Sequence, residues 1–432
     1  MISSELTNKN GHLMIGGVDS VDLASKYQTP LVVYDVEEIR NQVRLFKNSF
    51  EKSGLNYQIS YASKAFAAVG IYQVLNQEDV HTDVVSGGEL FTALKAGFPA
   101  DKISFHGNNK SQEELEMAVD NHVGVIILDN FYEIGLLEEI LETKDAKTNV
   151  MLRLTPGISA HTHKYDQTGQ VDSKFGFDVG SGQASEALQR VLSNKRMNLI
   201  GIHAHIGSQI FGVEGFVMLV KKMFEIAEDW KNKFSYVPQV INLGGGFGIS
   251  YNDQDEAIGP DVFIQKIVET VKQQAKAKDL ALPEIWIEPG RSIVGPAGYS
   301  LYTIGSRKDV PDLTSYVNVD GGMGDNIRPA LYQAKYEAVV ANKMDEKLTE
   351  DVHIAGKYCE SGDILIDHQK LPDTKAGDIL AILDTGAYGY SMASNYNRNP
   401  RPAVVFAEDG HDKLVVERES YEDLVKLDRN YI

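Results

Sequence analysis

The chain has 432 residues, 43% hydrophobic and 24% charged, proportions typical of a globular protein with about two domains. Its 42 basic and 61 acidic residues give a formal charge of −19, which argues against nucleic acid or an anionic membrane as a partner. No apolar run reaches the roughly 18 residues of a membrane span, the N-terminal residues lack the apolar core of a signal peptide, and the single cysteine, Cys359, excludes an intrachain disulfide. We therefore expect a cytoplasmic protein.

Short β-rich runs alternate with longer helical patterns between residues 57 and 291. The predicted strands are Gln58–Ala62, Thr82–Val85, Lys102–Phe105, Val123–Leu128, Asn149–Leu154, Leu199–His205, Gln239–Leu243 and Glu284–Ile287. Helical spacing lies between them, for example after the capping-box serine Ser111 and over Phe216–Asn232 and Asp261–Lys278. This alternation predicts a (β/α)₈ TIM barrel, with an open doubly wound sheet as the main alternative.

Polar or glycine-rich segments follow the predicted strands. They carry Lys64, Asp83, Ser86–Glu89, His106, Asp129, Arg153, His205–Ser208, Gly244–Gly248 and Glu288–Arg291. In a barrel the carboxyl ends of the strands converge on the face where active sites are found, whereas an open sheet would spread them along an edge. We therefore expect one active site at this face.

The remainder of the chain has a different pattern. Runs such as Ser315–Val319, Ile379–Leu383 and Ala403–Phe406 are separated by Gly, Asp and Pro turns, which predicts a second, mainly antiparallel β-barrel domain. The run Gly11–Ile15 is expected to add a strand to it. The predicted domains are a barrel over 36–291 and a β domain over 1–35 plus 292–432.

Lys64 lies at the end of the first predicted strand, between small residues. A lysine in such a position is a candidate to form an imine with a carbonyl group, because the amine's pKa shifts readily in a protein interior. The alternative interpretation is a solvated surface charge.

The glycine run Gly244–Gly248 follows the seventh predicted strand. Glycines let backbone amides approach a phosphate closely, and TIM barrels often bind phosphate at the loops after strands seven and eight. A tight strand-to-helix turn is the alternative. Glu288 ends the eighth strand, where it either faces a ring nitrogen of a cofactor or pairs with Arg291 to close the barrel.

Histidines at alternate positions allow three interpretations. His203 with His205, together with His161 and His163, is a candidate zinc set of a hydrolase barrel. Alternatively, one is a core histidine, or His205 stacks on an aromatic cofactor whose phosphate Ser208 binds. A zinc site would leave Lys64 and the glycine run without a role, so it ranks below a cofactor site.

Two segments of the β domain also carry chemistry. Cys359 precedes Glu360, and acidic neighbours disfavour a thiolate, which favours a proton donor over a nucleophile. A small buried hydrophobe is the alternative. Arg328 and Tyr332 form a pair suited to a carboxylate, or else a surface turn.

Together these segments resemble the alanine-racemase-fold group of pyridoxal-phosphate enzymes (fold type III), and within it the diaminopimelate decarboxylase family. The resemblance covers nearly the whole chain. It rests on Tyr61–Ala65, Asp83–Glu89, Ser173–Gly176, His205–Gln209, Gly244–Gly246, Glu288–Arg291, Arg328–Tyr332, Cys359–Asp363 and Gly386–Tyr396.

The resemblance implies a role for each site residue. Lys64 would anchor pyridoxal 5'-phosphate as an imine, His205 would stack on its ring, and Cys359 would donate a proton; these are the implied catalytic residues. The implied cofactor contacts also include Asp83, Ser208, Gly244, Gly245, Gly246, Glu288, Arg291 and Tyr388. The implied substrate contacts are Arg291, Arg328, Tyr332, Glu360 and Tyr388. No metal is implied, and the Cys359 segment would enter the partner's active site in a homodimer.

The implied reaction is decarboxylation of meso-2,6-diaminopimelate to L-lysine and CO₂, the last step of lysine biosynthesis. Arg328 for a carboxylate and Glu360 for an ammonium suit the second end of this small amino-acid substrate, whereas an amine-ended substrate would leave a buried arginine unpaired. The alternatives are an ornithine, arginine or carboxynorspermidine decarboxylase of the same fold, or a non-catalytic cofactor-binding regulator.

Overall fold

The computed structural model of the protein describes residues 6–158 and 173–432. The chain divides into two compact units, one formed by Gln42–Ile249 with Ala257–Ser292 and the other by the remaining residues. The domain boundaries predicted at residues 35/36 and 291/292 remain a prediction, because compact units need not be domains that fold independently. No helix in the described part of the chain is both long and apolar enough to cross a membrane.

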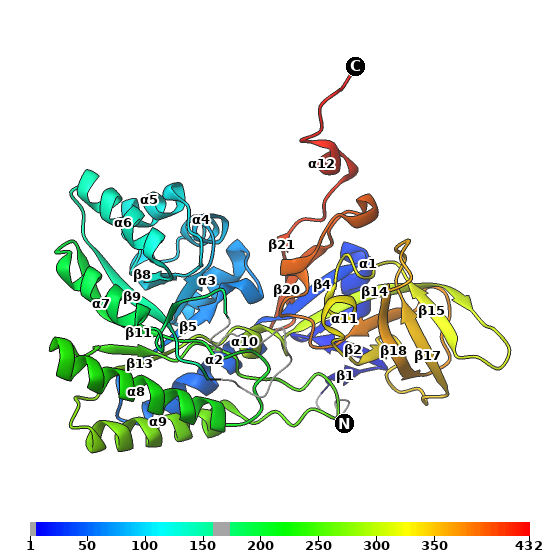
Figure 1. Ribbon diagram of the computed structural model, residues 1–432. Helices are drawn as coiled ribbons and strands as arrows, with labels where there is room; N and C mark the ends of the chain where they lie inside the picture. Colours follow the sequence, from blue (N-terminus) through cyan, green and yellow to red (C-terminus); the bar gives the residue numbers. More distant parts are fainter. Residues whose placement is uncertain (1–5, 159–172) are drawn as a thin grey trace. The chain divides into compact units, whose positions relative to one another are not determined.

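The first unit is a closed barrel of parallel strands (Figure 1). Within the described residues eight strands pair in sequence order, and the pairing of Ile126–Leu128 with Val150–Leu152 completes the ring. The strands are β5 (Tyr57–Ala62), β6 (His81–Val84), β7 (Ile103–Phe105), β8 (Val125–Leu128), β9 (Thr148–Thr155), β11 (Met197–His203), β12 (Val240–Asn242) and β13 (Glu284–Ile287). A two-residue strand, β10 (Phe177–Asp178), extends β9. The predicted TIM barrel is therefore confirmed, and the open sheet is excluded.

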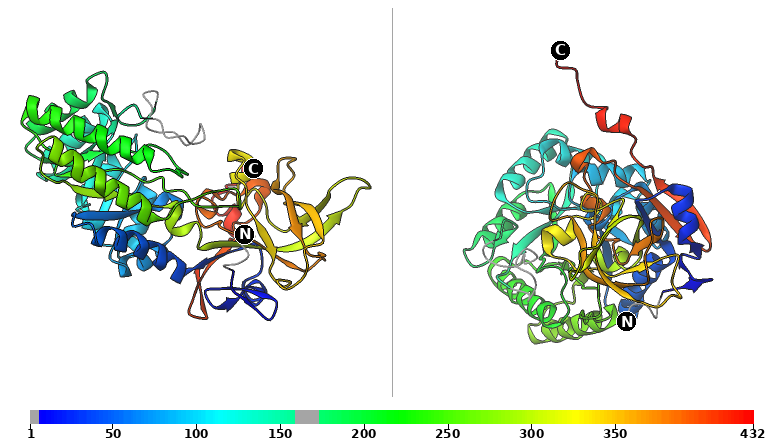
Figure 2. Two further views of the ribbon diagram at one scale, coloured as in Figure 1. Left: turned by 90° about the horizontal axis from the view of Figure 1, so that it is seen from below. Right: turned by 90° about the vertical axis from the view of Figure 1, so that its right-hand side faces the viewer.

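Amphipathic helices cover the outside of the barrel, as both views of Figure 2 show for the cyan and green segments. Ser111 caps its helix with a full capping box, as the Ser-x-x-Glu pattern predicts. The helices are α2 (Val36–Glu51), α3 (Val69–Gln77), α4 (Gly87–Lys95), α5 (Gln112–Asp120), α6 (Phe131–Thr143), α7 (Gln183–Ser193), α8 (Glu214–Phe234) and α9 (Pro260–Ala277). A buried four-residue helix, α10 (Arg291–Val294), follows β13. Side chains of alternate strand residues, such as Val125 and Ile127, pack together with Met151, Val240 and Trp286.

The second unit is a mainly antiparallel nine-stranded sheet. Only two of its pairings, β15 with β17 and β4 with β20, are parallel among the described strands. The strands are β4 (Leu31–Asp35), β14 (Gly298–Lys308), β15 (Ser315–Val319), β16 (Ala338–Val340), β17 (Glu350–Ala355), β18 (Ile364–Leu371), β19 (Ile379–Ile382), β20 (Ala403–Glu408) and β21 (His411–Val416). Two short helices, α11 (Arg328–Tyr332) and α12 (Tyr421–Val425), belong to the same unit.

The N-terminal segment adds the expected strand to this unit, but outside the main sheet. Strand β2 (His12–Ile15) pairs with β1 (Asn8–Lys9) and β3 (Val18–Asp19) in a separate three-stranded sheet. Leu13 and Ile15 nevertheless pack in one core cluster with β4, β14 and β20, next to helix α1 (Ser20–Tyr27). The segment that enters the main sheet is β4, whose fully buried residues give no alternating pattern.

Candidate active site

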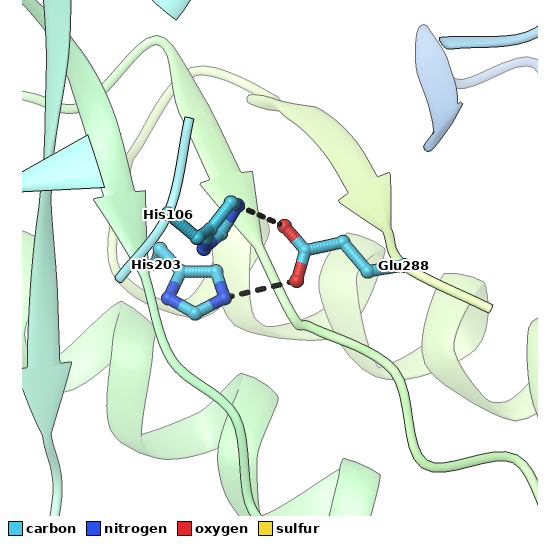
Figure 3. A group of neighbouring side chains, drawn as sticks. All are labelled: His106, His203 and Glu288. Carbon is cyan, nitrogen blue, oxygen red and sulfur yellow. Dashed lines mark hydrogen bonds and ion pairs between the residues drawn. The ribbon is translucent and has the colours of Figure 1, made fainter. Parts of the chain in front are cut away.

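A buried carboxylate, Glu288, lies at the carboxyl end of β13 among groups from three other strand ends, two of which, His106 and His203, are drawn in Figure 3. Asn242, at the end of β12, donates from Nδ2 to Glu288 Oε1 at 2.6 Å. His203, at the end of β11, has its Nε2 3.1 Å from Oε2. His106, which follows β7, has its Nε2 3.0 Å from Oε1. The barrel thus surrounds one carboxylate with three nitrogen groups.

The cluster holds Glu288 as an anion. Burial by itself raises the pKa of Glu288, but the adjacent His106 and His203 outweigh it and hold the pKa well below its ordinary value. Burial lowers the pKa of His203 to about 4 and also lowers that of His106. Near neutral pH both rings are therefore neutral. His203 then directs an Nε2 proton at the carboxylate, whereas His106 Nε2 lies close to it without hydrogen-bond alignment.

Lys64 lies in a short 3₁₀ turn, Ser63–Ala65, directly after β5. Its side chain is exposed, whereas Ser63 and Ala65 are buried. The loop that carries Glu288 packs against this turn: the Ala62 amide donates to the Pro289 carbonyl at 3.1 Å, and a Cβ at Gly290 would lie 2.8 Å from the Ala62 Cβ. Gly290 therefore lets the lysine and the carboxylate approach each other at one mouth of the barrel.

Asp83 and His205 lie within the electrostatic reach of Lys64. Burial, and then the charge of Glu288, raises the pKa of Asp83 well above its ordinary value, although Lys64 opposes this. Burial lowers the pKa of His205 well below its ordinary value, and the charges of Lys64 and Arg153 add to the effect. His205 is thus a neutral ring, with Nδ1 accepting from the Gly245 amide at 3.2 Å.

The glycine run after β12 packs where side chains have no room. A Cβ at Gly245 would lie 2.1 Å from the Glu288 carbonyl oxygen, and one at Gly246 would lie 2.3 Å from the Gly207 oxygen. Gly246 has φ +108°, in the region that favours glycine. Close by, Arg291 Nη2 donates to Ser208 Oγ at 2.8 Å. Backbone amides, a hydroxyl and a guanidinium are therefore gathered as the donors that an anion requires.

The second unit holds a buried arginine surrounded by tyrosines. Arg328 begins α11 and donates from Nε to the Tyr336 hydroxyl at 2.9 Å. Its guanidinium carbon lies 5.4 to 5.8 Å from the ring centres of Tyr251, Tyr332 and Tyr388. Within residues 6–158 and 173–432, Arg328 has no carboxylate partner. A buried cation of this kind is a receptor for an anionic ligand.

Cys359 and Glu360 lie on an exposed loop of the same unit. Asp363 braces the loop by accepting hydrogen bonds from the amides of Tyr358 at 2.8 Å and Met323 at 2.6 Å. The Cys359 amide donates to Asn397 Oδ1 at 2.8 Å. A fixed backbone therefore presents both side chains to the outside, which excludes the small buried hydrophobe as the interpretation of Cys359.

The structure brings most of the expected residues into two groups. The barrel group contains Lys64, Asp83, His205, Ser208, Gly244, Gly245, Gly246, Glu288 and Arg291; the second unit groups Arg328, Tyr332 and Tyr388, with Cys359 and Glu360 on their own loop. The contacts of Glu288 were not predicted. His106 was expected at this face and His203 was considered as a zinc ligand, but neither was assigned to Glu288. Asn242 was missed, and its position at the end of a barrel strand is the signal that would have found it.

The two described members of the candidate zinc set, His203 and His205, have different partners. His203 turns to Glu288, whereas His205 accepts from the Gly245 amide. His161 and His163 lie outside the described residues.

Comparisons with known proteins agree with the geometry. A family model described as "Pyridoxal-dependent decarboxylase, pyridoxal binding domain" matches residues 36–295. A diaminopimelate decarboxylase of Bacillus subtilis is 56% identical over 98% of this chain and 96% of its own, and one of Bacillus methanolicus is 58% identical over 95% of both. A crystal structure of diaminopimelate decarboxylase from M. jannaschii with L-lysine superposes with a TM-score of 0.93 at 35% identity, covering 100% of this chain and 99% of that one. The chain belongs to the pyridoxal-dependent decarboxylases, in the group of the diaminopimelate decarboxylases.

Proposed function

We propose that the protein decarboxylates meso-2,6-diaminopimelate to L-lysine and CO₂. The observation that carries the substrate assignment is Arg328, a buried arginine that has no acidic partner within the described residues. The far end of diaminopimelate is a carboxylate with an adjacent ammonium, and its carboxylate supplies the missing partner. An ornithine or arginine side chain ends in a cation, which would meet a buried cation of the same sign.

The cofactor is pyridoxal 5'-phosphate, and the barrel residues fit it. Lys64 supplies the amine that anchors its aldehyde, and Ser208 with the glycine run Gly244–Gly246 would hold the phosphate. Glu288 is ionised by its surroundings and would hold the proton of the ring nitrogen. When bound, this cofactor supplies an electron sink for the electron pair that remains at Cα after CO₂ leaves.

The other residues bind and orient the substrate. Arg291 lies beside Ser208 at the barrel mouth, where its guanidinium suits the carboxylate nearer the reacting carbon. Tyr388 has φ +59°, a backbone conformation that a tyrosine rarely adopts, and such strain is concentrated at functional positions. Tyr332 and Tyr388 line the guanidinium of Arg328 and restrict its orientation.

Cys359 and Glu360 would act across a subunit interface. Both side chains are exposed on a braced loop, and within the described residues neither has a partner. Supplied to the active site of a second copy, the Cys359 thiol would protonate Cα and Glu360 would accept the substrate's distal ammonium. The working unit is then a homodimer with shared active sites. The cytoplasmic location expected from the sequence stays a prediction.

The test compares substrates that differ at one end. Purified protein loaded with pyridoxal 5'-phosphate is assayed for CO₂ release from meso-2,6-diaminopimelate, L-lysine, L-ornithine and L-arginine. L-Lysine is the matched control, because it lacks only the distal carboxylate of diaminopimelate. We expect turnover of diaminopimelate and little of the other three. Turnover confined to the amine-ended substrates would overturn the assignment, and absence of any turnover despite bound cofactor would indicate the regulator.

A further inference from the structure

The two oxygens of Glu288 are not held alike. Oε1 accepts a 2.6 Å hydrogen bond from Asn242 and also faces His106 Nε2 at 3.0 Å. Oε2 faces His203 Nε2 at 3.1 Å, and no other donor approaches this oxygen in the described part of the chain. The His106 contact lacks good hydrogen-bond alignment, so Asn242 fixes Oε1 and His203 alone fixes Oε2.

The hydrogen-bonding capacity of the carboxylate follows from this asymmetry. An ionised carboxylate offers about four lone-pair positions. Asn242 takes one position on Oε1, and the His106 Nε2, 3.0 Å away but not aligned as a hydrogen bond, crowds the second; His203 takes one position on Oε2. One position remains, and it belongs to Oε2.

The proton on His203 is placed by its environment. The ring is almost fully buried, and its Nδ1 has no hydrogen-bond partner among the described residues. A doubly protonated ring would bury an unpaired N–H, whereas a neutral ring with its proton on Nε2 leaves only a lone pair at Nδ1. His203 is therefore a neutral donor directed at Oε2.

We propose that His203 is a positioning residue that fixes Oε2 of Glu288 as the acceptor for the cofactor's ring-nitrogen proton. This inference rests on the proposed function and deepens it. His106 and Asn242 hold the other oxygen, so the carboxylate cannot rotate freely about its Cγ–Cδ bond. The consequence is that Glu288 stays ionised and correctly turned before any ligand arrives, and this preorganisation costs no rearrangement during the reaction.

Other charged groups also face Glu288. Arg153 and the two histidines stabilise its charge, whereas Asp83 opposes ionisation when it is itself charged. These groups stay in place when His203 alone is changed. A variant at His203 therefore reports the loss of one directed hydrogen bond.

The first experiment uses protein without cofactor. Infrared difference spectra, wild type minus Glu288→Gln, follow protonation of the Glu288 carboxyl as pH is lowered. In His203→Leu we expect its pKa to rise by roughly two units, because a buried carboxylate loses its donor on one oxygen. His203→Gln keeps an N–H donor and should recover most of the shift. His106→Leu is the matched control, and a smaller shift is expected since Asn242 still holds Oε1.

The second experiment uses the cofactor-loaded protein. The ¹⁵N chemical shift of pyridoxal phosphate labelled at its ring nitrogen reports whether that nitrogen is protonated. We expect His203→Leu to move the shift toward the unprotonated value and to lower kcat roughly 100-fold at similar KM. His106→Leu should change both less. If His203→Leu fails to fold, as judged by circular dichroism, His203→Asn makes the same comparison, because its side chain is too short to reach Oε2.

Unchanged ionisation of Glu288 and an unchanged ¹⁵N shift in His203→Leu would overturn the proposal. Equal effects of the His203 and His106 variants would overturn it too, because Oε2 would then have no special role. The carboxylate titration does not depend on turnover. A wild type that rejects diaminopimelate would therefore refute the proposed function and leave this inference open to its own test.

Discussion

The two units of this protein differ in the partners that they provide for a buried charge. Glu288 in the barrel is surrounded by nitrogen groups from three other strand ends, and its charge is stabilised before any ligand binds. Arg328 in the β unit has one tyrosine hydroxyl and three tyrosine rings, and among the described residues no acid faces it.

The difference follows from what each charge has to do. A carboxylate that holds a cofactor must keep one geometry through every turnover, so the chain itself supplies its partners. An arginine that selects a substrate gains specificity when its partner comes with the ligand. Cation–π contacts of about 0.5 to 2 kcal/mol each offset part of the cost of burying it. Under the proposed function, a ligand without a carboxylate would leave that cost unrecovered and bind more weakly.

The largest effect on turnover is expected from a substitution of Lys64, the amine at the same barrel mouth as Glu288. Lys64→Ala removes the amine that we propose as the covalent anchor of the cofactor, so turnover should fall at least about 1,000-fold. The visible absorbance of the anchored cofactor should also disappear, because it depends on the imine. Absorbance spectra and CO₂ release measure both. A variant that keeps the wild-type absorbance would show that another lysine is the anchor.

A substitution of Arg328 tests the second buried charge of the comparison. Arg328→Ala should lower kcat/KM for diaminopimelate about 100-fold or more, because a charged, bidentate contact is lost from a buried site. The visible cofactor absorbance should stay intact, since the barrel residues are untouched.

Arg307 provides the matched control for Arg328. It lies in the same unit but already has acidic partners, Glu350 at 2.5 Å and Asp309 at 2.8 Å. Arg307→Ala should therefore leave kcat/KM close to that of the wild type. If Arg328→Ala also loses the cofactor absorbance, its role is structural and the comparison between the two buried charges fails.

Subunit mixing tests whether the exposed loop completes the site of a partner. Lys64→Ala and Cys359→Ala should each be inactive alone. After exchange of equal amounts, half of the dimers are hybrids with one intact site of two, so about one quarter of wild-type activity should return. Mixing Lys64→Ala with Arg328→Ala is the informative second pair, since it tests whether Arg328 acts in the site of Lys64's own subunit. Failure of the first pair to recover activity would place Cys359 in the site of its own subunit.

The barrel could be predicted from the sequence because its strands alternate with helices in a regular order. Glu284–Ile287 was predicted to the residue, the carboxyl ends at Ala62, Phe105 and Leu128 were also exact, and the other strand ends differ by one or two positions. The expected strand at Gly11–Ile15 forms in the β unit, but its pairing in a separate small sheet could not be predicted, because a hydrophobic pattern indicates burial and leaves the pairing partner undetermined.

The site could be predicted only in part, for a physical reason. Glu288 and Lys64 were found because they end strands, but the contacts of Glu288 with His106, His203 and Asn242 depend on how strands distant in sequence are registered. The register of a parallel barrel is set by packing, as at Gly201, where a Cβ would lie 2.2 Å from the Val240 carbonyl oxygen. Such close approaches are properties of the folded chain.

The smallest effect is expected at Asp325, a buried acid three residues before Arg328 that does not pair with it. Asp325 Oδ2 accepts from the Gly322 amide at 3.0 Å, and burial raises the carboxyl's pKa to about 7 despite that bond. Because the folded chain binds this proton more tightly, its stabilising contribution is complete below the ordinary pKa of an aspartate and is lost as pH rises through about 7.

Asp325→Asn should remove that dependence, because the amide mimics the protonated acid at every pH. We expect the variant to gain a few degrees of thermal stability relative to wild type between pH 5 and pH 8, measured by circular dichroism on cofactor-free protein. Asp309→Asn is the contrasting control, since hydrogen bonds from Ser315 and Arg307 lower its pKa and it is already charged across this range. A constant difference between Asp325→Asn and wild type across the range would mean that Asp325 is ionised in the folded protein. The β unit would then contain a buried anion beside its unpaired cation, and the contrast between Glu288 and Arg328 would need another explanation.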